Sequence, residues 1–175
     1  MLRGSEVVGH PVITHDGGKK VGEVKDLVID RGGSVVLGLL LDEGGWFKHA
    51  RVVAWPAIQV IGPDAVIIDS DNSVVKASEA PDMKDVLERG HVLLGRRVQT
   101  HDGRDLGKME AVFFNASSGA VEGFELSGGL AADSHSGRAF LPASRSFQAG
   151  EDVAFVDPSA ADTLQDMKKM TASRK

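Results

Sequence analysis

The stretch VGHPVITHDGGKKVGEVKDLVID, residues 8–30, recurs in altered form as LGRRVQTHDGRDLGKMEAVFFN, residues 94–115, with one residue fewer in the turn. Both copies contain Thr-His-Asp-Gly, at 14–17 and at 100–103. An Asp-Gly pair between two strand-like stretches predicts a tight β-hairpin turn, in which Gly17 takes the positive φ that such turns need. We therefore interpret the two His-Asp pairs as one turn that was copied together with its flanking strands.

The repeat extends beyond this hairpin and keeps its order. GLLLDEGG (38–45) aligns with GFELSGGL (123–130), and VVAWPAIQVIGPDAVIID (52–69) aligns with RAFLPASRSFQAGEDVAFVD (138–157). Self-similarity that keeps its order indicates a duplicated unit, here of roughly 70 residues, a length that can just form a core of its own. The sequence therefore predicts two successive domains of similar fold.

Each half is expected to be mainly β, because Val, Ile and Phe concentrate in short runs between Gly and Asp clusters. We predict two tandem small antiparallel β-barrels, one in residues 1–80 and one in 81–175, each followed by a short helix. Closing or nearly closing the strands would remove exposed sheet edges. Gly22 and Gly107 interrupt strand-like runs and indicate bulges or bends. The strands predicted in the first half are 10–14, 20–30, 35–42, 51–54, 58–61 and 65–69.

The two helices are predicted near 81–89 and 159–169. Pro81 and Pro158 suit the first turn of a helix, since the missing N–H would have no partner there. The halves are expected to pack against each other or against a second copy of the chain, because each barrel is small. The apolar face of the first helix should be buried in that contact: Met83, Val86 and Leu87.

Composition excludes several classes of protein. The chain has 175 residues, with 20 Lys and Arg against 25 Asp and Glu, and the net charge of −5 disfavours a nucleic-acid binder. The absence of cysteine excludes disulfides, a thiolate zinc site and a cysteine nucleophile. No apolar stretch approaches the roughly 18 residues of a membrane span, and the first residues lack a signal-like apolar run. The expected location is the cytoplasm.

With its hairpin, its Gly-containing strand and its Pro-containing corner, the sequence resembles PRC-barrel proteins, in tandem. The resemblance rests on the three quoted motifs and covers about 8–70 and about 93–157. It implies a protein-binding or assembly module without catalytic residues or a cofactor. Similar barrels occur in the H subunit of the photosynthetic reaction centre and in the ribosome-maturation factor RimM. A fold alone does not identify a partner.

One loop stands out as a candidate partner-binding site. GGWFKHAR (44–51) combines two aromatic residues with basic ones in an otherwise acidic half. Aromatic and Arg side chains often anchor protein interfaces, whereas stacking on nucleic-acid bases and packing within the barrel are the alternatives. Trp55, beside Pro56, is expected to pack at a corner of the barrel instead. The candidate interface residues are Trp46, Phe47, Lys48, His49 and Arg51.

Three hypotheses for function follow. The first is a non-enzymatic adaptor that binds a protein partner of unknown identity. The second is an RNA-processing or ribosome-associated factor, by analogy with RimM. The third is a metal-binding or hydrolytic protein that uses the His-Asp pairs at 15–16 and 101–102, but neighbouring turn residues point apart and no further ligands repeat beside them. We expect no catalytic, metal or cofactor site.

Overall fold

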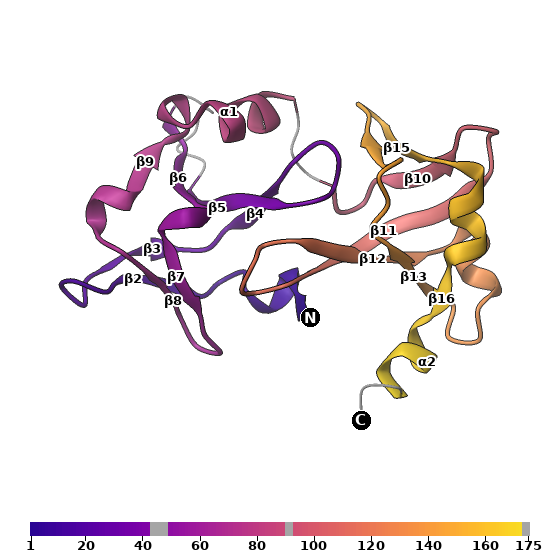
Figure 1. Cartoon of the computed structure of the whole chain (residues 1–175), viewed down its shortest axis with the longest axis horizontal. Coiled ribbons are helices and arrows are strands. Elements are labelled where there is room, and N and C mark those ends of the chain that lie inside the picture. Colours follow the sequence, from indigo (N-terminus) through magenta and orange to yellow (C-terminus); the bar gives the residue numbers. More distant parts are fainter. Residues whose placement is uncertain (43–48, 90–92, 173–175) are drawn as a thin grey trace.

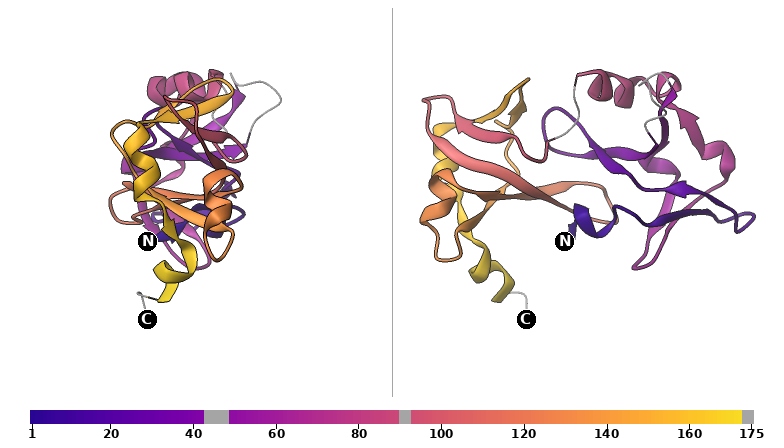
Figure 2. Two further views of the ribbon diagram at one scale, coloured as in Figure 1. Left: turned by 90° about the vertical axis from the view of Figure 1, so that its right-hand side faces the viewer. Right: turned by 180° about the vertical axis from the view of Figure 1, so that it is seen from behind.

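The computed structural model describes residues 1–42, 49–89 and 93–172. It consists mainly of short strands in two halves that lie side by side, as Figure 1 and the rear view in Figure 2 show. The helix α1 (Pro81–Glu88) lies at the end of the first half, and α2 (Met167–Ala172) lies near the end of the second. The prediction of a mainly β fold is therefore confirmed. No helix within the described residues is long and apolar enough to cross a membrane.

The first half contains two four-stranded sheets. Their strand orders are β3-β2-β8-β7 and β4-β5-β6-β9. The pairing of β2 with β8 is parallel, and the other pairings are antiparallel. The strands are β2 (Pro11–Thr14), β3 (Lys20–Glu23), β4 (Asp26–Ile29), β5 (Val36–Asp42), β6 (Arg51–Ala54), β7 (Ile58–Ile61), β8 (Val66–Ile68) and β9 (Val74–Lys76).

The second half forms one eight-stranded sheet with the order β14-β15-β10-β11-β12-β13-β16, and the short strand β1 (Leu2–Arg3) pairs with β11 off this path. The chain therefore begins on the second half before it enters the first. Here too one pairing is parallel, that of β10 with β15. The strands are β10 (Arg97–Thr100), β11 (Asp105–Phe114), β12 (Val121–Ser127), β13 (Arg138–Pro142), β14 (Gln148–Ala149), β15 (Val153–Val156) and β16 (Gln165–Asp166).

The sheets are open, which differs from the closed or nearly closed barrels that the sequence predicts. Among the described residues no pairing joins the two edge strands of any sheet. The predicted strand 20–30 is in fact two strands, because the backbone changes partner between them. The amide of Val24 donates to His10 O at 2.9 Å, whereas the amide of Lys25 donates to Leu40 O at 2.7 Å. This switch divides the first half into two sheets.

The two halves repeat the same local structure. In the first hairpin of each half, an equivalent valine pairs with the predicted glycine: Val12 with Gly22, and Val98 with Gly107. The register of the two strands shifts directly after that valine in both halves. The predicted bulges at these glycines are confirmed. Short 3-10 helices connect the strands, at Gly4–Glu6, Trp55–Ala57, Asp71–Ser73, Ala77–Glu79, Gly129–Asp133 and Pro158–Thr163.

The helix α1 begins at Pro81, as predicted, but it packs differently from the prediction. Its apolar face is buried against the outer side of the first half's own sheet, not in the contact between the halves. A strand residue from each of β4, β5 and β6 lies beneath it: Val28, Leu40 and Val52.

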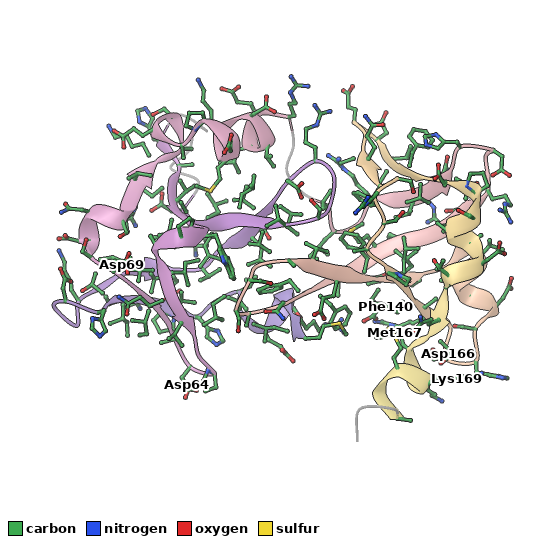
Figure 3. The ribbon with its side chains drawn as sticks, in the orientation of Figure 1. Asp64, Asp69, Phe140, Asp166, Met167 and Lys169 are labelled. Carbon is green, nitrogen blue, oxygen red and sulfur yellow. The ribbon has the colours of Figure 1, made fainter. Side chains whose placement is uncertain are left out.

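The helix predicted near 159–169 is shorter and later than expected. A 3-10 helix, Pro158–Thr163, is followed by the two-residue strand β16, and only then does α2 begin. The chain becomes extended there because Gln165 and Asp166 pair with the edge of β13. The helix α2 then lies on the outer face of the second sheet, where Met167 packs against Phe140 (Figure 3).

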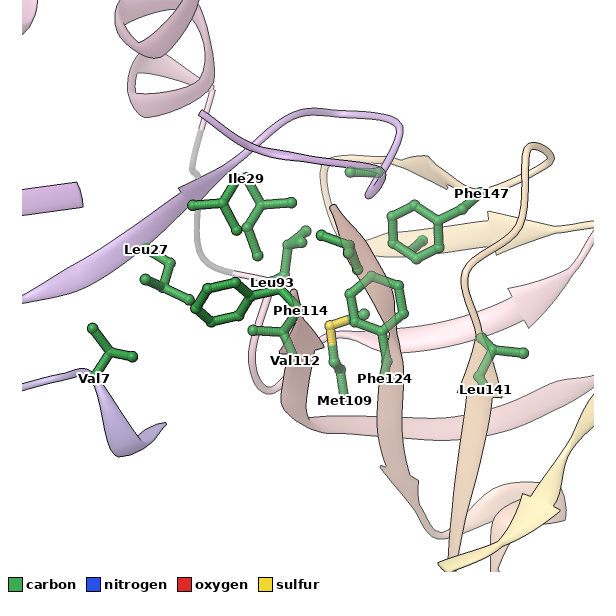
Figure 4. Close-up of a cluster of buried hydrophobic side chains, with 14 of the residues drawn as sticks. Val7, Leu27, Ile29, Leu93, Met109, Val112, Phe114, Phe124, Leu141 and Phe147 are labelled. Carbon is green, nitrogen blue, oxygen red and sulfur yellow. The ribbon is translucent and has the colours of Figure 1, made fainter. Parts of the chain in front are cut away.

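A single hydrophobic core runs through both halves (Figure 4). It joins residues such as Leu27 and Ile29 of the first half to Val112 and Phe114 of the second. Two hairpins, β4-β5 and β11-β12, reach toward the opposite half (Figure 1). The halves therefore depend on each other for burial of their apolar side chains.

The two hairpins meet through a reciprocal pair of backbone hydrogen bonds. The amide of Val36 donates to Gly119 O at 2.8 Å, and the amide of Val121 donates to Ser34 O at 2.9 Å. Val36 and Val121 are equivalent in the repeat, as are Ser34 and Gly119. The junction is thus built like the contact in a two-fold symmetric dimer, in which each partner uses the same patch.

Candidate functional site

Most of the predicted partner-binding loop, Trp46, Phe47 and Lys48, lies outside the described residues. His49 is exposed. Arg51 is engaged within the fold, because its Nε donates to Asp42 Oδ2 at 2.6 Å and its Nη1 donates to Val21 O at 3.2 Å. Arg51 therefore links the end of the β5-β6 hairpin to β3.

Trp55 packs at the junction of the halves, in agreement with its predicted packing role. Its ring lies edge-on to Phe114 of the second half, with centroids 6.1 Å apart. The same indole lies beside Gly119 at the tip of the β11-β12 hairpin. Trp55 thus stabilises the contact between the halves.

The two Thr-His-Asp-Gly turns are structurally equivalent. The side-chain oxygen of the buried threonine accepts a backbone hydrogen bond in each, from Lys19 to Thr14 at 3.0 Å and from Arg104 to Thr100 at 2.9 Å. The amide of the following histidine donates to the last residue of the parallel strand, to Ile68 O at 2.7 Å and to Val156 O at 3.1 Å. These contacts support the interpretation of a copied turn.

The glycine with positive φ in the first turn is Gly18 (φ 60°) and not the predicted Gly17, whereas in the second turn it is Gly103 (φ 87°). The first turn is one residue longer, which moves this position along the chain. In both turns the amide of the positive-φ glycine donates to the threonine carbonyl, at 2.9 Å for Gly18 and 3.0 Å for Gly103.

The two His-Asp pairs lie in these turns at the surface. His15 and Asp16 are exposed, and His101 stacks on Phe155 with ring centroids 5.3 Å apart. A hydrogen bond from the Thr100 hydroxyl holds the pKa of Asp102 below its ordinary value, and Arg104 adds to this effect. Within the described ranges no three His, Asp or Glu side chains lie close enough to hold a metal ion.

If the turn is structural, its threonine should matter more than its histidine. We expect Thr100→Val to lower the free energy of unfolding by about 1–2 kcal/mol, because the Arg104 amide loses its buried acceptor. His15→Ala should change it by less than about 0.5 kcal/mol. His101→Ala should fall between these values, because it removes the stack on Phe155. Urea unfolding measures all three. A zinc-dependent rise in melting temperature that vanished in the histidine variants would instead indicate a metal site.

A candidate site is an apolar cleft between the halves, with a volume of about 350 Å³. Leu27 and Ile29 of the first half and Leu93 and Val112 of the second half line it. Val8 and Leu94 lie on it as well. We call this cleft, including Val8 and Leu94, the junction cleft.

Val8 and Leu94 are unusual because each leaves 45% of its surface exposed, although both are large and apolar. They occupy equivalent positions in the repeat, since each precedes a glycine whose amide donates a hydrogen bond to an equivalent backbone carbonyl further along the chain. Gly9 donates to Val24 O at 2.8 Å, and Gly95 donates to Met109 O at 2.7 Å. The two walls of the junction cleft are therefore copies of one another.

The charges at the cleft differ between its two walls. Lys25 of the first half and Glu110 of the second occupy equivalent positions, and both line the cleft. A hydrogen bond from Ser127 holds the pKa of Glu110 below its ordinary value, and Lys108 adds to this effect. Glu110 is consequently ionised at neutral pH. Asp26 lines the cleft beside Lys25, so the first wall carries both signs of charge and the second carries the Glu110 carboxylate.

Sequence reasoning missed the junction cleft, although one signal was available. Val8 and Leu94 align in the repeat as large apolar residues directly before glycine. Strand alternation alone does not show whether such a residue is buried. Their exposure depends on how the two halves meet, which no local pattern reports.

Comparison with known proteins agrees with the duplicated architecture. The family model described as PRC-barrel domain matches residues 1–75 and 85–162. A protein of Clostridium acetobutylicum, itself described as uncharacterized, is 36% identical over 69 residues, which represent 37% of this chain and 79% of that protein. Because the two matched segments include most of the chain, the chain belongs to the PRC-barrel domain family.

Proposed function

We propose that this chain is a non-enzymatic adaptor that holds a segment of a protein partner in the junction cleft. The observation that carries this proposal is the pair of exposed apolar residues, Val8 and Leu94, on an apolar cleft. Exposed apolar surface arranged around a hollow is typical of binding sites, whereas isolated exposed apolar residues are ordinary. The repeat makes this arrangement systematic, because both residues occupy the same position in their halves.

The proposed adaptor is built from two modules of similar structure. We propose that each half is a PRC barrel in which the strands curve around part of the shared core. The change of backbone partner between Val24 and Lys25 supports this, since it carries one strand from the first sheet into the second. Such a pair of modules can present a rigid cleft, and we place the protein in the cytoplasm.

The test compares two exposed apolar residues in different places. Leu94→Asp places a charge on the junction cleft, whereas Val60→Asp places the same charge on β7, where Val60 is 53% exposed and does not line the cleft. We expect partner binding to fall at least about tenfold for Leu94→Asp and to stay near the wild-type level for Val60→Asp. Quantitative mass spectrometry of proteins captured from the native host, with thermal melts of each variant, measures this.

A partner captured equally by all three proteins would contradict the proposal. Repeating the capture after nuclease treatment tests the alternative hypothesis, a role in RNA processing or at the ribosome. If capture by the wild type depended on intact RNA, the ribosome-associated hypothesis would replace the adaptor hypothesis. We expect capture to survive nuclease treatment, because the net charge of −5 opposes broad binding to phosphate backbones.

A further inference from the structure

Two arginines differ from the other arginines of the described chain. Within residues 1–42, 49–89 and 93–172, the guanidinium groups of Arg31 and Arg145 have neither a hydrogen-bond acceptor nor an acidic partner. The remaining described arginines each donate to a carboxylate or to a backbone carbonyl: Arg3, Arg51, Arg89, Arg96, Arg97, Arg104 and Arg138.

The two exceptions lie together although they come from different halves. Arg31 belongs to the β4-β5 hairpin, and Arg145 lies between β13 and β14. Both line one surface pocket of about 350 Å³, with Gly32, Ser146, Phe147 and Gln148. A hydrogen bond from the Ala149 amide to Arg31 O, 2.9 Å long, ties the hairpin to the second half beside this pocket.

Among the described residues no carboxylate forms an ion pair with either arginine, although Asp30, Glu88 and Glu151 line a neighbouring pocket with Arg31. Asp30 precedes Arg31, but its carboxylate accepts hydrogen bonds from the Ser34 amide and hydroxyl, both at 2.7 Å, and from the Val35 amide at 2.9 Å. Both arginines are exposed, so water can solvate them, and an anion that enters the pocket can contact both guanidinium groups at once. In a chain with 25 acidic residues and 20 basic ones, two neighbouring arginines without partners are conspicuous.

We infer that this pocket binds a phosphate monoester of a small molecule. A guanidinium group offers paired donors that match phosphate oxygens, and two such groups supply the charge that a dianion needs. Gln148 is exposed at the same pocket and carries further amide donors. A phosphodiester has one charge fewer and two blocked oxygens, so it should bind more weakly. This site is separate from the junction cleft and does not depend on the adaptor proposal.

Binding should also stabilise the junction, because the two arginines come from opposite halves. An anion held between them adds a contact that exists only when the halves are together. A ligand that binds the folded state raises its stability according to its concentration and affinity. Melting temperature therefore reports binding, in addition to calorimetry.

The experiment titrates the full chain with glycerol 3-phosphate, inorganic phosphate and dimethyl phosphate, at constant ionic strength and up to about 20 mM. The variants are Arg31→Gln and Arg145→Gln. Arg104→Gln is the matched control, because it removes the same charge from the second Thr-His-Asp-Gly turn, away from the pocket. Comparison among variants cancels the general stabilising effect of phosphate salts on proteins.

We expect glycerol 3-phosphate and inorganic phosphate to bind the wild type and Arg104→Gln with similar affinity. Each pocket variant should bind at least about fivefold more weakly, and dimethyl phosphate should bind the wild type at least about fivefold more weakly than the monoester. Equal affinities in all variants, or no binding by the wild type, would overturn the site. Equal affinity for dimethyl phosphate would overturn its assignment to a dianion.

Discussion

Gly38→Ala is expected to lower the free energy of unfolding by about 2–3 kcal/mol, although it adds a single methyl group. Gly38 is buried in the centre of β5, next to β6 and beneath α1. A Cβ atom there would overlap the carbonyl oxygen of Val53 and would lie 2.7 Å from Met83 Sδ. The Met83 side chain can move aside. The Val53 carbonyl cannot, because it belongs to the neighbouring strand.

The second half provides an independent test of the same explanation. Gly123 is the equivalent residue, and a Cβ there would overlap the Phe140 ring and lie 2.5 Å from Leu141 O. Gly123→Ala should therefore cost a similar amount. Glycine at the centre of a strand marks a close approach of another group, and the repeat has kept that approach in both halves.

Gly17→Ala serves as the control, since it makes the same substitution in an open place. The nearest atom to a Cβ at Gly17 is Thr14 Oγ1 at 3.7 Å, and Gly17 has no positive φ. Its effect should stay within about 0.5 kcal/mol. Urea unfolding of the three variants measures the difference. Similar losses for Gly17→Ala and Gly38→Ala would show that the clash with the Val53 carbonyl does not cause the loss at Gly38.

The local structure of this fold could be predicted well from the sequence. Strands 51–54 and 58–61 were predicted with the bounds that the structure has, and both bulged glycines were identified. These features depend on alternation and turn chemistry within a few residues. The position of the positive-φ glycine was missed by one residue, because the two turns differ in length.

Features that depend on distant contacts could not be predicted. The chain switches sheets between Val24 and Lys25, and the position of this switch depends on which strands lie beside each segment. The strand β16 exists because the edge of β13 is free to pair with it. The exposure of Val8 and Leu94, and the convergence of two arginines at one pocket, likewise depend on how the halves meet.

The second large effect is expected at Glu125, the buried carboxylate of the second sheet. Its side chain is 3% exposed, and it occupies the position that Leu40 has in the first half. Arg3 Nη1 donates to Glu125 Oε2 at 2.7 Å, and Arg138 Nη1 donates to Oε1. Arg3 comes from β1, so the start of the chain neutralises a charge in the other half. The sequence contains no signal for this crossing.

Replacing both arginines by methionine, in Arg3→Met/Arg138→Met, should lower the free energy of unfolding by about 3–5 kcal/mol, because Glu125 is left buried without a cation. Adding Glu125→Leu to that double variant should restore most of the loss. Leucine already fills the equivalent position in the first half, where Leu40 is buried beneath α1. Glu125→Leu alone should be close to neutral, since both arginines are partly exposed and remain solvated.

A control with exposed ion pairs separates burial from charge. Arg51→Met/Arg97→Met also removes two arginines, but their partners Asp42 and Asp105 are exposed enough to be solvated. Each exposed pair should contribute less than about 1 kcal/mol. If the Arg3 and Arg138 variant lost no more stability than this control, or if Glu125→Leu failed to rescue it, the carboxylate would not need its cations. The expected rescue would show that the buried charge persists in the second half because two arginines, Arg3 from the start of the chain and Arg138 from the neighbouring strand β13, neutralise it.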